Sequence, residues 1–246
     1  MTATARQLAL PLRLPPPSPG ALLEDSSNAE ALAWLARPGA WPLHRLALHG
    51  PAATGKSHML AEFAARHAWP ALDGPALRGL PEVPEGPGLA VDDADCAADE
   101  AALFHLLNIC AERRQAVLLA GRAPPARWPV ALPDLASRLR AITAVGVQPP
   151  SDALLAALLR KHFAARQLRV DPGVQEWLLL RLPREAAAMA EAAARLDKAA
   201  LAAGGAVTRP LARAALGDWL GLDPAPTDDV SMAMEEAASP PTPRLL

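Results

Sequence analysis

The chain has 246 residues, and 51% of them are hydrophobic, which suffices for one core-forming domain and a smaller appendage. Its 24 Lys and Arg residues against 26 Asp and Glu residues give a net charge of −2. This near balance of acidic and basic residues argues against a protein whose main task is binding nucleic acid, because contacts with phosphates need a basic face. Two cysteines can form neither a disulfide framework nor a zinc site by themselves. The sequence shows no signal peptide and no apolar run of about 18 residues, so we expect a cytoplasmic protein without membrane contact.

Prolines mark the beginning of the chain. Residues 1–20 contain Pro11, Pro15, Pro16, Pro17 and Pro19, which forbid helix and favour an extended segment. Strands are then predicted at 45–49, 68–73, 89–91, 116–120 and 142–147. Helices are predicted from a cap at Ser27 or Asn28 to residue 36, and at 55–67, 99–114 and 132–140. This alternation over residues 21–148 predicts an α/β fold, a parallel sheet with helices on both faces.

Only helices are predicted beyond Pro149 and Pro150. Their expected ranges are 151–167 with Ser151 as cap, a helix opened by Asp171 and Pro172, 184–203, and 210–220. Residues 151–221 should therefore form a small all-α domain. The segment 222–246 is acidic and proline-rich, which predicts disorder.

The segment Gly50-Pro51-Ala52-Ala53-Thr54-Gly55-Lys56-Ser57 fits the pattern G-x-x-x-x-G-K-[ST] between a predicted strand and a predicted helix. In such a loop the backbone N–H groups surround phosphate oxygens, and the helix N-terminus adds positive potential. Lys56 is expected to reach the β- and γ-phosphates, and the Ser57 hydroxyl to bind Mg²⁺. A chance loop in a chain rich in small residues is the alternative, but the flanking elements favour ADP or ATP binding.

A second signal is the apolar run Leu89-Ala90-Val91 followed by Asp92 and Asp93. A carboxylate at the end of a buried strand is what a Walker B site needs beside Mg²⁺. Asp92 is predicted to bind Mg²⁺ through water, and Asp93 to orient an attacking water. A strand ending in Asp can also be a simple turn signal, but the P-loop about 40 residues earlier favours the metal-binding interpretation.

Two arginines are candidates for contact with a nucleotide. Arg138 ends a short predicted helix; by itself it would be a solvated helix residue. In nucleotidases assembled from neighbouring subunits, however, such an arginine completes the neighbour's site. Arg184 opens a predicted helix of the all-α domain, where it could approach the nucleotide of its own subunit or serve only as a helix-end charge.

The N-terminal segment contains Gln7, Leu8, Leu10, Pro11 and Leu12. An extended peptide with a glutamine and spaced leucines suits a partner's hydrophobic groove, and its prolines lower the ordering cost. On these residues alone, incidental leucines in a disordered start are the favoured interpretation.

The combination of GPAATGKSH, LAVDD, FHLLN at 104–108 and LPDLASRL resembles the AAA+ module of the bacterial initiator DnaA, and more closely its short relatives of the Hda family. The resemblance implies an AAA+ domain at 21–148, a helical lid at 151–221 and no DNA-reading domain. It makes RQLALPLRLP a binding motif for the DNA polymerase III sliding clamp, its β subunit. It assigns nucleotide binding to Gly50, Pro51, Ala52, Ala53, Thr54, Gly55, Lys56, Ser57, His58 and Arg184.

The resemblance also implies a function. Hda-like proteins bind ADP, dock on the clamp and supply an arginine finger to ATP-bound DnaA, which promotes hydrolysis and prevents re-initiation. Arg138 takes that finger role here. Where the initiators carry an acidic sensor-1 residue, this chain has Gly121 and Arg122, so weak or no ATPase activity of its own is expected.

Two other functions fit the same motifs. One is an autonomous P-loop ATPase, such as a helicase loader; the other is a clamp-binding AAA+ adaptor for a different partner. We expect no direct sequence-specific DNA binding. The oligomeric state, with a homodimer as one option, and the purpose of the acidic tail stay open.

Overall fold

The computed structural model describes residues 22–221. The predicted clamp-binding peptide within residues 1–20 and the tail at 222–246 lie outside this range. Within the described residues, the chain separates into two compact units. One comprises residues 22–160 and 183–190, and the other comprises residues 161–182 and 191–221.

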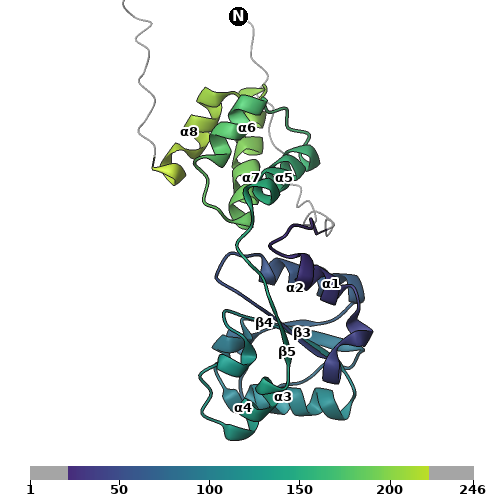
Figure 1. Cartoon of the computed structure of the whole chain (residues 1–246). Helices are drawn as coiled ribbons and strands as arrows, with labels where there is room; N and C mark the ends of the chain where they lie inside the picture. Colours follow the sequence, from purple (N-terminus) through teal and green to yellow (C-terminus); the bar gives the residue numbers. More distant parts are fainter. Residues whose placement is uncertain (1–21, 222–246) are drawn as a thin grey trace, which may run out of the picture. The chain divides into compact units, whose positions relative to one another are not determined.

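A parallel sheet organises the first unit (Figure 1). Its strands are β1 (Arg45–His49), β2 (Ala71–Asp73), β3 (Gly88–Asp92), β4 (Ala116–Gly121) and β5 (Thr143–Gly146). The spatial order is β2-β3-β4-β1-β5, and every neighbouring pair is parallel. All five carboxyl ends therefore meet at one edge, called here the carboxyl edge; the opposite edge is the amino edge.

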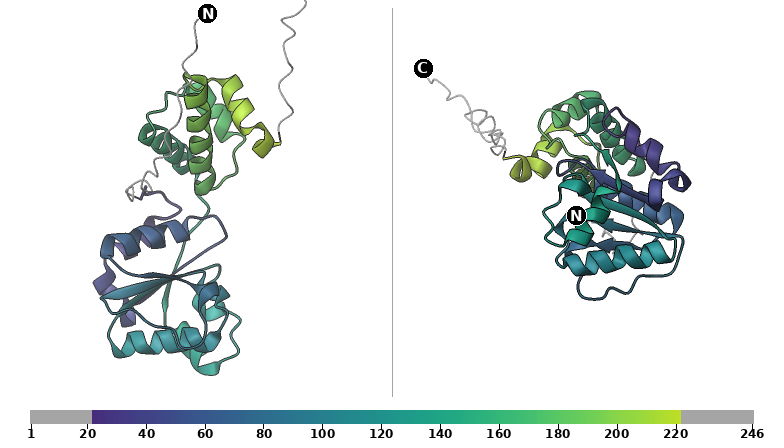
Figure 2. Two further views of the ribbon diagram at one scale, coloured as in Figure 1. Left: turned by 180° about the vertical axis from the view of Figure 1, so that it is seen from behind. Right: turned by 60° about the horizontal axis from the view of Figure 1, so that its bottom comes forward.

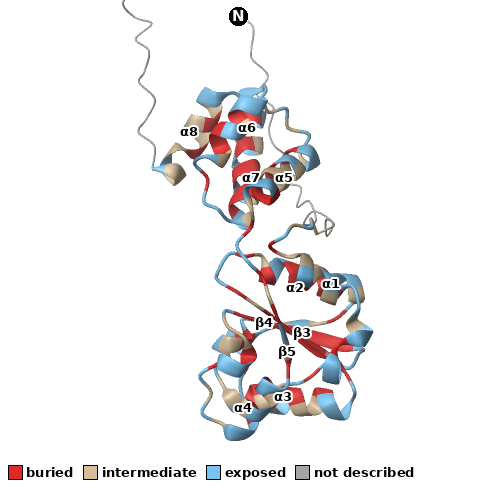
Figure 3. Cartoon of the chain, viewed as in Figure 1, coloured by how far each residue is buried: buried red, intermediate tan, exposed pale blue. Residues whose placement is uncertain are grey.

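Helices cover both faces of this sheet, as the alternating sequence pattern predicts (Figures 1 and 2). One face carries α1 (Ala29–Leu35) and α2 (Lys56–His67), and the other carries α3 (Glu100–Glu112) and α4 (Pro133–Arg140). Strand side chains alternate between two separate cores, so that Leu46 and Leu48 pack with α2 while Ala47 packs with α3. The central strands are consequently buried on both sides (Figure 3).

The helix caps show which of the capping residues predicted from the sequence form cap hydrogen bonds. Asp99 caps α3, since its side chain accepts hydrogen bonds from the backbone N–H groups of Ala101 and Ala102. The predicted cap at the start of α1 is wrong in its chemistry. Asn28 occupies the cap position, but its side chain accepts from Asp25 N and donates to Leu23 O. Because its side chain bonds to the backbone before α1, Asn28 makes no hydrogen bond to the first N–H groups of the helix.

The remaining helices are α5 (Asp152–Ala165), α6 (Pro172–Leu179), α7 (Ala186–Ala203) and α8 (Arg209–Leu220). Ser151 caps α5 by accepting from Leu154 N at 3.1 Å, and Asp171 caps α6 by accepting from Gly173 N at 2.8 Å, as predicted. A single parallel bridge joins Val170 to Val207 within the second unit. None of the helices between residues 22 and 221 has the length and hydrophobicity of a membrane span.

Candidate functional site

The predicted phosphate-binding loop leaves the sheet at the carboxyl edge. It follows β1, which lies between β4 and β5, and it leads directly into α2. Gly50 makes the turn out of the strand: a Cβ atom here would lie 2.1 Å from the carbonyl oxygen of Val147. Gly55 precedes α2 with φ +94°, a left-handed conformation that favours glycine. The two glycines therefore shape a loop whose backbone can surround a phosphate.

Lys56 lies at the first position of α2 and is buried. Its Nζ donates to the carbonyl oxygens of Gly50, at 2.8 Å, and Pro51, at 2.7 Å. Burial lowers the pKa of the Lys56 ammonium, while the carboxylates of Asp93, Asp92 and Asp95 oppose that shift. The lysine is thus held over the loop by backbone oxygens and faces a cluster of acids.

Gly50→Ala should destabilise the protein by about 1–3 kcal/mol, because the new methyl group cannot fit against Val147 without moving backbone. Urea unfolding of the full chain measures this loss. Gly39→Ala is the matched control, since its Cβ would meet no atom within 4 Å. Equal stability of the two variants would contradict the close approach of Gly50 and Val147.

The predicted acidic pair lies on the neighbouring part of the same edge. Asp92 ends β3 and is half-buried, and Asp93 follows it with a left-handed φ of 45°. The Asp93 N–H donates to Asp92 Oδ1 at 3.0 Å. Burial, and next the charges of Asp92 and Asp95, raise the pKa of the Asp93 carboxyl. Gly74 permits this arrangement, because a Cβ there would lie 2.3 Å from Asp93 O.

These residues fit a nucleotide phosphate and Mg²⁺. Gly50 lets the loop pass close to the backbone of Val147, and Ser57 is exposed at the start of α2. Hydroxyl and carboxylate oxygens are the hard ligands that Mg²⁺ prefers. Ser57 and Asp92 would hold the ion, which supplies charge neutralisation to the phosphates when bound. His58 is exposed beside Ser57 on α2.

Sequence reasoning missed one element of this edge. Asp95 accepts a 2.7 Å hydrogen bond from the backbone N–H of Arg122, which directly follows β4. The only local signal was a third acid two residues beyond Asp93. The contact itself spans 27 residues, so spacing along the chain could not have revealed it.

Arg138 lies at the opposite edge of the sheet from Lys56. Its helix, α4, ends shortly before β5, whose first residue pairs with Leu46 at the beginning of β1. The Arg138 guanidinium stacks over the ring of Phe104, 5.2 Å from the ring centroid. Burial, and next the charge of Arg138, lower the pKa of Arg45, the first residue of β1. Arg138 is therefore not brought together with the loop of its own chain.

Arg184 is exposed and lies two residues before α7, so the prediction that it opens the helix is wrong. Pro183 and Arg184 form an irregular turn ahead of the helix. The Arg184 guanidinium forms an ion pair with Asp152 at the start of α5. Both partners are solvent-exposed, so the pair adds little stability. The structure thus gives Arg184 a partner that the sequence pattern did not indicate.

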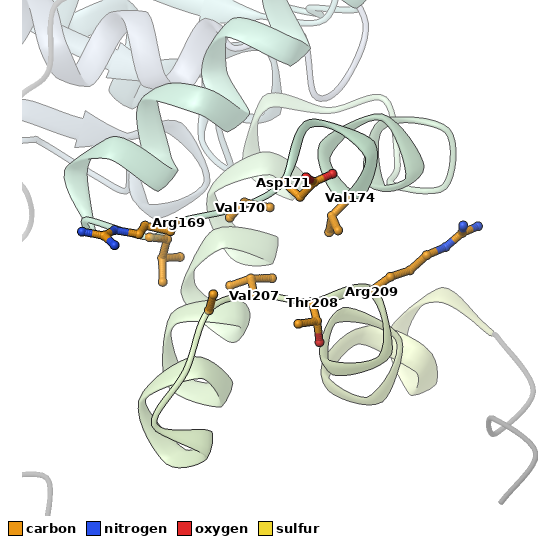
Figure 4. A pocket seen from close by; sticks show the side chains of 9 residues that line it. Arg169, Val170, Asp171, Val174, Val207, Thr208 and Arg209 are labelled. Carbon is orange, nitrogen blue, oxygen red and sulfur yellow. The ribbon is translucent and has the colours of Figure 1, made fainter. Parts of the chain in front are cut away.

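The second unit has an open groove of about 670 Å³ (Figure 4). Val170, Val174 and Val207 form its apolar floor, and Arg169 and Arg209 extend outward at its margins. None of the predicted site residues within the described part of the chain lines this groove. The predicted clamp motif, Gln7 to Leu12, lies outside the described residues.

The fold is similar to those of solved AAA+ structures. Domain III of the Thermotoga maritima replication initiation protein DnaA superposes with a TM-score of 0.64 at 15% identity, covering 81% of this chain and 95% of that one. The AMPPCP-bound DnaA from Aquifex aeolicus gives 0.52 at 16% identity, with 69% of this chain and 61% of that one covered. The Thermotoga maritima RuvB Holliday junction branch migration motor superposes with a TM-score of 0.59 at 14% identity, covering 79% of this chain and 69% of that one.

A family comparison gives a narrower result for the helices. Residues 152–216 match the family described as "Hda, lid domain", and this range runs from α5 into α8. The sheet order, the helices on both faces and the matched lid agree with the predicted fold class. Residues 152–216 thus resemble the Hda lid domain, and the chain shares the fold of DnaA domain III.

Proposed function

We propose that this chain binds an adenine nucleotide at the carboxyl edge of its sheet and supplies Arg138 to ATP bound by a DnaA-type partner. Hydrolysis of the partner's ATP would then lower the amount of ATP-bound, active initiator and so prevent re-initiation of DNA replication. The family of the lid and the DnaA-like fold support a role connected with replication initiation.

The position of Arg138 is the observation that carries this proposal. β1 spans five residues, so its ends lie about 13 Å apart at about 3.3 Å per residue. The loop with Lys56 follows one end, whereas Arg138 lies near the other. Arg138 is half-buried, and its guanidinium rests on an aromatic ring at the protein surface. Such an arginine is suited to a neighbour's phosphate and unsuited to its own chain's nucleotide.

The carboxyl edge supports nucleotide binding by this chain itself. Gly50, Gly55 and Lys56 form the phosphate loop, and Asp92 and Ser57 are the proposed Mg²⁺ ligands. DnaA from Aquifex aeolicus, which shares the fold, was solved with AMPPCP. We propose ADP as the working nucleotide, with Arg184 as a further contact from the lid.

Hydrolysis of DnaA-bound ATP should be measured with and without this protein, and with and without sliding clamp loaded on DNA. Faster hydrolysis only when protein and loaded clamp are both present supports the proposal. Steady ATP turnover by this chain alone would favour an autonomous ATPase instead. Clamp binding without any effect on DnaA would favour an adaptor for another partner.

The combined change Gln7→Ala and Leu10→Ala should abolish clamp binding, because it removes the polar anchor and one apolar anchor of the proposed motif. A pull-down on immobilised clamp measures the loss, and stimulated hydrolysis should fall with it. Thr2→Ala combined with Thr4→Ala changes two residues that precede the motif and should leave both measurements unchanged. Full clamp binding by the first variant would reject the N-terminal motif.

A further inference from the structure

The groove of the second unit is formed by two short segments that lie side by side. Residues 168–171 follow α5, residues 206–209 lead into α8, and the parallel bridge between Val170 and Val207 joins them. Val174 on α6 completes the apolar floor; Val174 and Val207 are buried, and Val170 is half-buried. All lining residues belong to the second unit, so this compact body carries the whole groove by itself.

Two exposed arginines lie at the margins of the groove. In Figure 4 the side chains of Arg169 and Arg209 extend away from the valines in opposite directions. The Arg209 guanidinium lies 5.6 Å from the ring centroid of Trp177, and no acid in the described part of the chain forms an ion pair with either arginine. Asp171 is the acid among the lining residues, and its Oδ1 already accepts from Gly173 N. A complementary occupant therefore has an apolar centre and acids at both ends.

The chain beyond the described residues contains a segment of this kind. Residues 228–236 read Asp-Asp-Val-Ser-Met-Ala-Met-Glu-Glu. In an extended chain successive side chains point to opposite sides, so Val230, Met232 and Met234 would share one face, with two acids before them and two after them. Methionine adapts its shape readily to an irregular apolar surface. The order of residue types along the segment thus matches the groove.

The length of the chain after α8 brings this segment within reach of the groove. α8 begins at Arg209, beside the groove, and its 12 residues extend about 18 Å at about 1.5 Å per residue. Gly221 follows with φ +62°, a left-handed conformation that ends the helix. Residues 222–227 contain two prolines and can span about 19 Å at about 3.1 Å per residue. They are long enough to run back along α8 and bring residue 228 to Arg209.

We propose that residues 228–236 of the same chain bind in this groove. The leading acids, Asp228 and Asp229, face Arg209, the apolar residues cover the valine floor, and the two trailing acids face Arg169. Exposed ion pairs contribute little energy, so the apolar contacts supply most of the binding and the charges set the direction of the segment. The short linker holds the segment at an effective concentration of about 1 mM, so even weak binding keeps the groove filled. This inference goes beyond the proposed role at DnaA and does not depend on a bound nucleotide.

A fluorescent peptide of residues 226–238 tests this docking on the full chain. Val230→Ser combined with Met232→Ser and Met234→Ser, called here the tail variant, should leave the groove empty. Fluorescence anisotropy should show about 10-fold tighter binding of the peptide to the tail variant than to the wild-type chain, because the wild-type segment competes at about 1 mM and a peptide Kd of about 0.1 mM is expected. Leu245→Ser with Leu246→Ser removes two apolar residues outside the segment and should bind the peptide as weakly as wild type.

Charge reversal tests the place and the direction of binding. Added to the tail variant, Arg209→Glu should weaken binding of the peptide about 3-fold to 10-fold, because repulsion replaces attraction at an exposed site. A peptide carrying Asp228→Lys and Asp229→Lys should recover binding to that chain and should not recover it when Arg169→Glu is used instead. Lys198→Glu, an exposed change on α7 of the same unit and outside the groove, should leave peptide binding unchanged.

Three results would contradict the proposal. Equal binding of the peptide to wild type and to the tail variant, or binding to neither, would mean that the segment does not occupy the groove. Unchanged peptide binding after both arginine reversals would place the peptide elsewhere on the chain. Light scattering that shows a wild-type dimer and a monomeric tail variant would assign the segment in the groove to a second copy.

Discussion

Arg138→Ala is expected to abolish the stimulation of DnaA-ATP hydrolysis by this protein. An arginine supplied by a neighbouring subunit stabilises charge on the transferring phosphoryl group, and its loss costs about 10³-fold to 10⁵-fold in rate. Single-turnover hydrolysis of ATP on DnaA, with clamp loaded on DNA, measures the loss. Arg138→Lys should recover little, because a lysine lacks the bidentate fork.

The structure provides the controls for this variant. Stacking on Phe104 contributes only about 0.5–1 kcal/mol at an exposed site, and removing Arg138 also relieves its repulsion of the buried Arg45. Stability, nucleotide binding and clamp binding should therefore stay close to wild type. Arg140→Ala removes the same charge from the same helix and should keep the stimulation. Full stimulation by Arg138→Ala would exclude it as the finger.

Lys56→Ala is expected to weaken binding of ADP to this chain at least about 100-fold. The ammonium contributes charge-assisted hydrogen bonds worth about 1.5–3 kcal/mol each, and about 1.4 kcal/mol corresponds to a factor of 10. Calorimetric titration of the purified chain with Mg²⁺-ADP measures the change. Lys56→Arg should not restore binding, because the loop carbonyls of Gly50 and Pro51 already surround the compact ammonium group.

Two controls separate a lost ligand from a damaged loop. Lys198→Ala removes an exposed lysine of α7 and should leave ADP binding unchanged. Thermal unfolding without nucleotide reports how much the buried Lys56 contributes to the loop itself. Wild-type affinity for ADP in Lys56→Ala would mean that the loop is not a phosphate site.

The parts of the site that sequence could predict are contiguous in the chain. The strand, loop and helix from Arg45 to His67 follow one another without interruption, and the predicted strand at 45–49 has the bounds of β1. The acidic pair could also be predicted from the sequence, because Asp92 ends a buried apolar strand. The local pattern of hydrophobic residues and the spacing of the glycines in the loop motif determine these features.

The missed features depend on contacts between distant segments. The bond between Asp95 and Arg122 forms only because β3 and β4 are neighbours in the sheet. Arg184 pairs with Asp152 at the start of a different helix, which no periodicity in its own segment indicates. Asn28 had the right residue type for a cap, but the preceding chain uses its side chain. Tertiary context decided all three.

The two ends of the strand β1 lie near two different proposed functional features. Its carboxyl end leads to the loop for which we propose phosphate binding, while Arg138 lies near its amino end, and the two edges point away from each other. A contact that joins one edge to the opposite edge of a neighbour is heterologous, so it adds subunits head to tail. A two-fold dimer pairs a patch with itself and would leave such a contact unmade. A partner engaged through Arg138 would therefore leave this chain's own nucleotide on the far side of the pair.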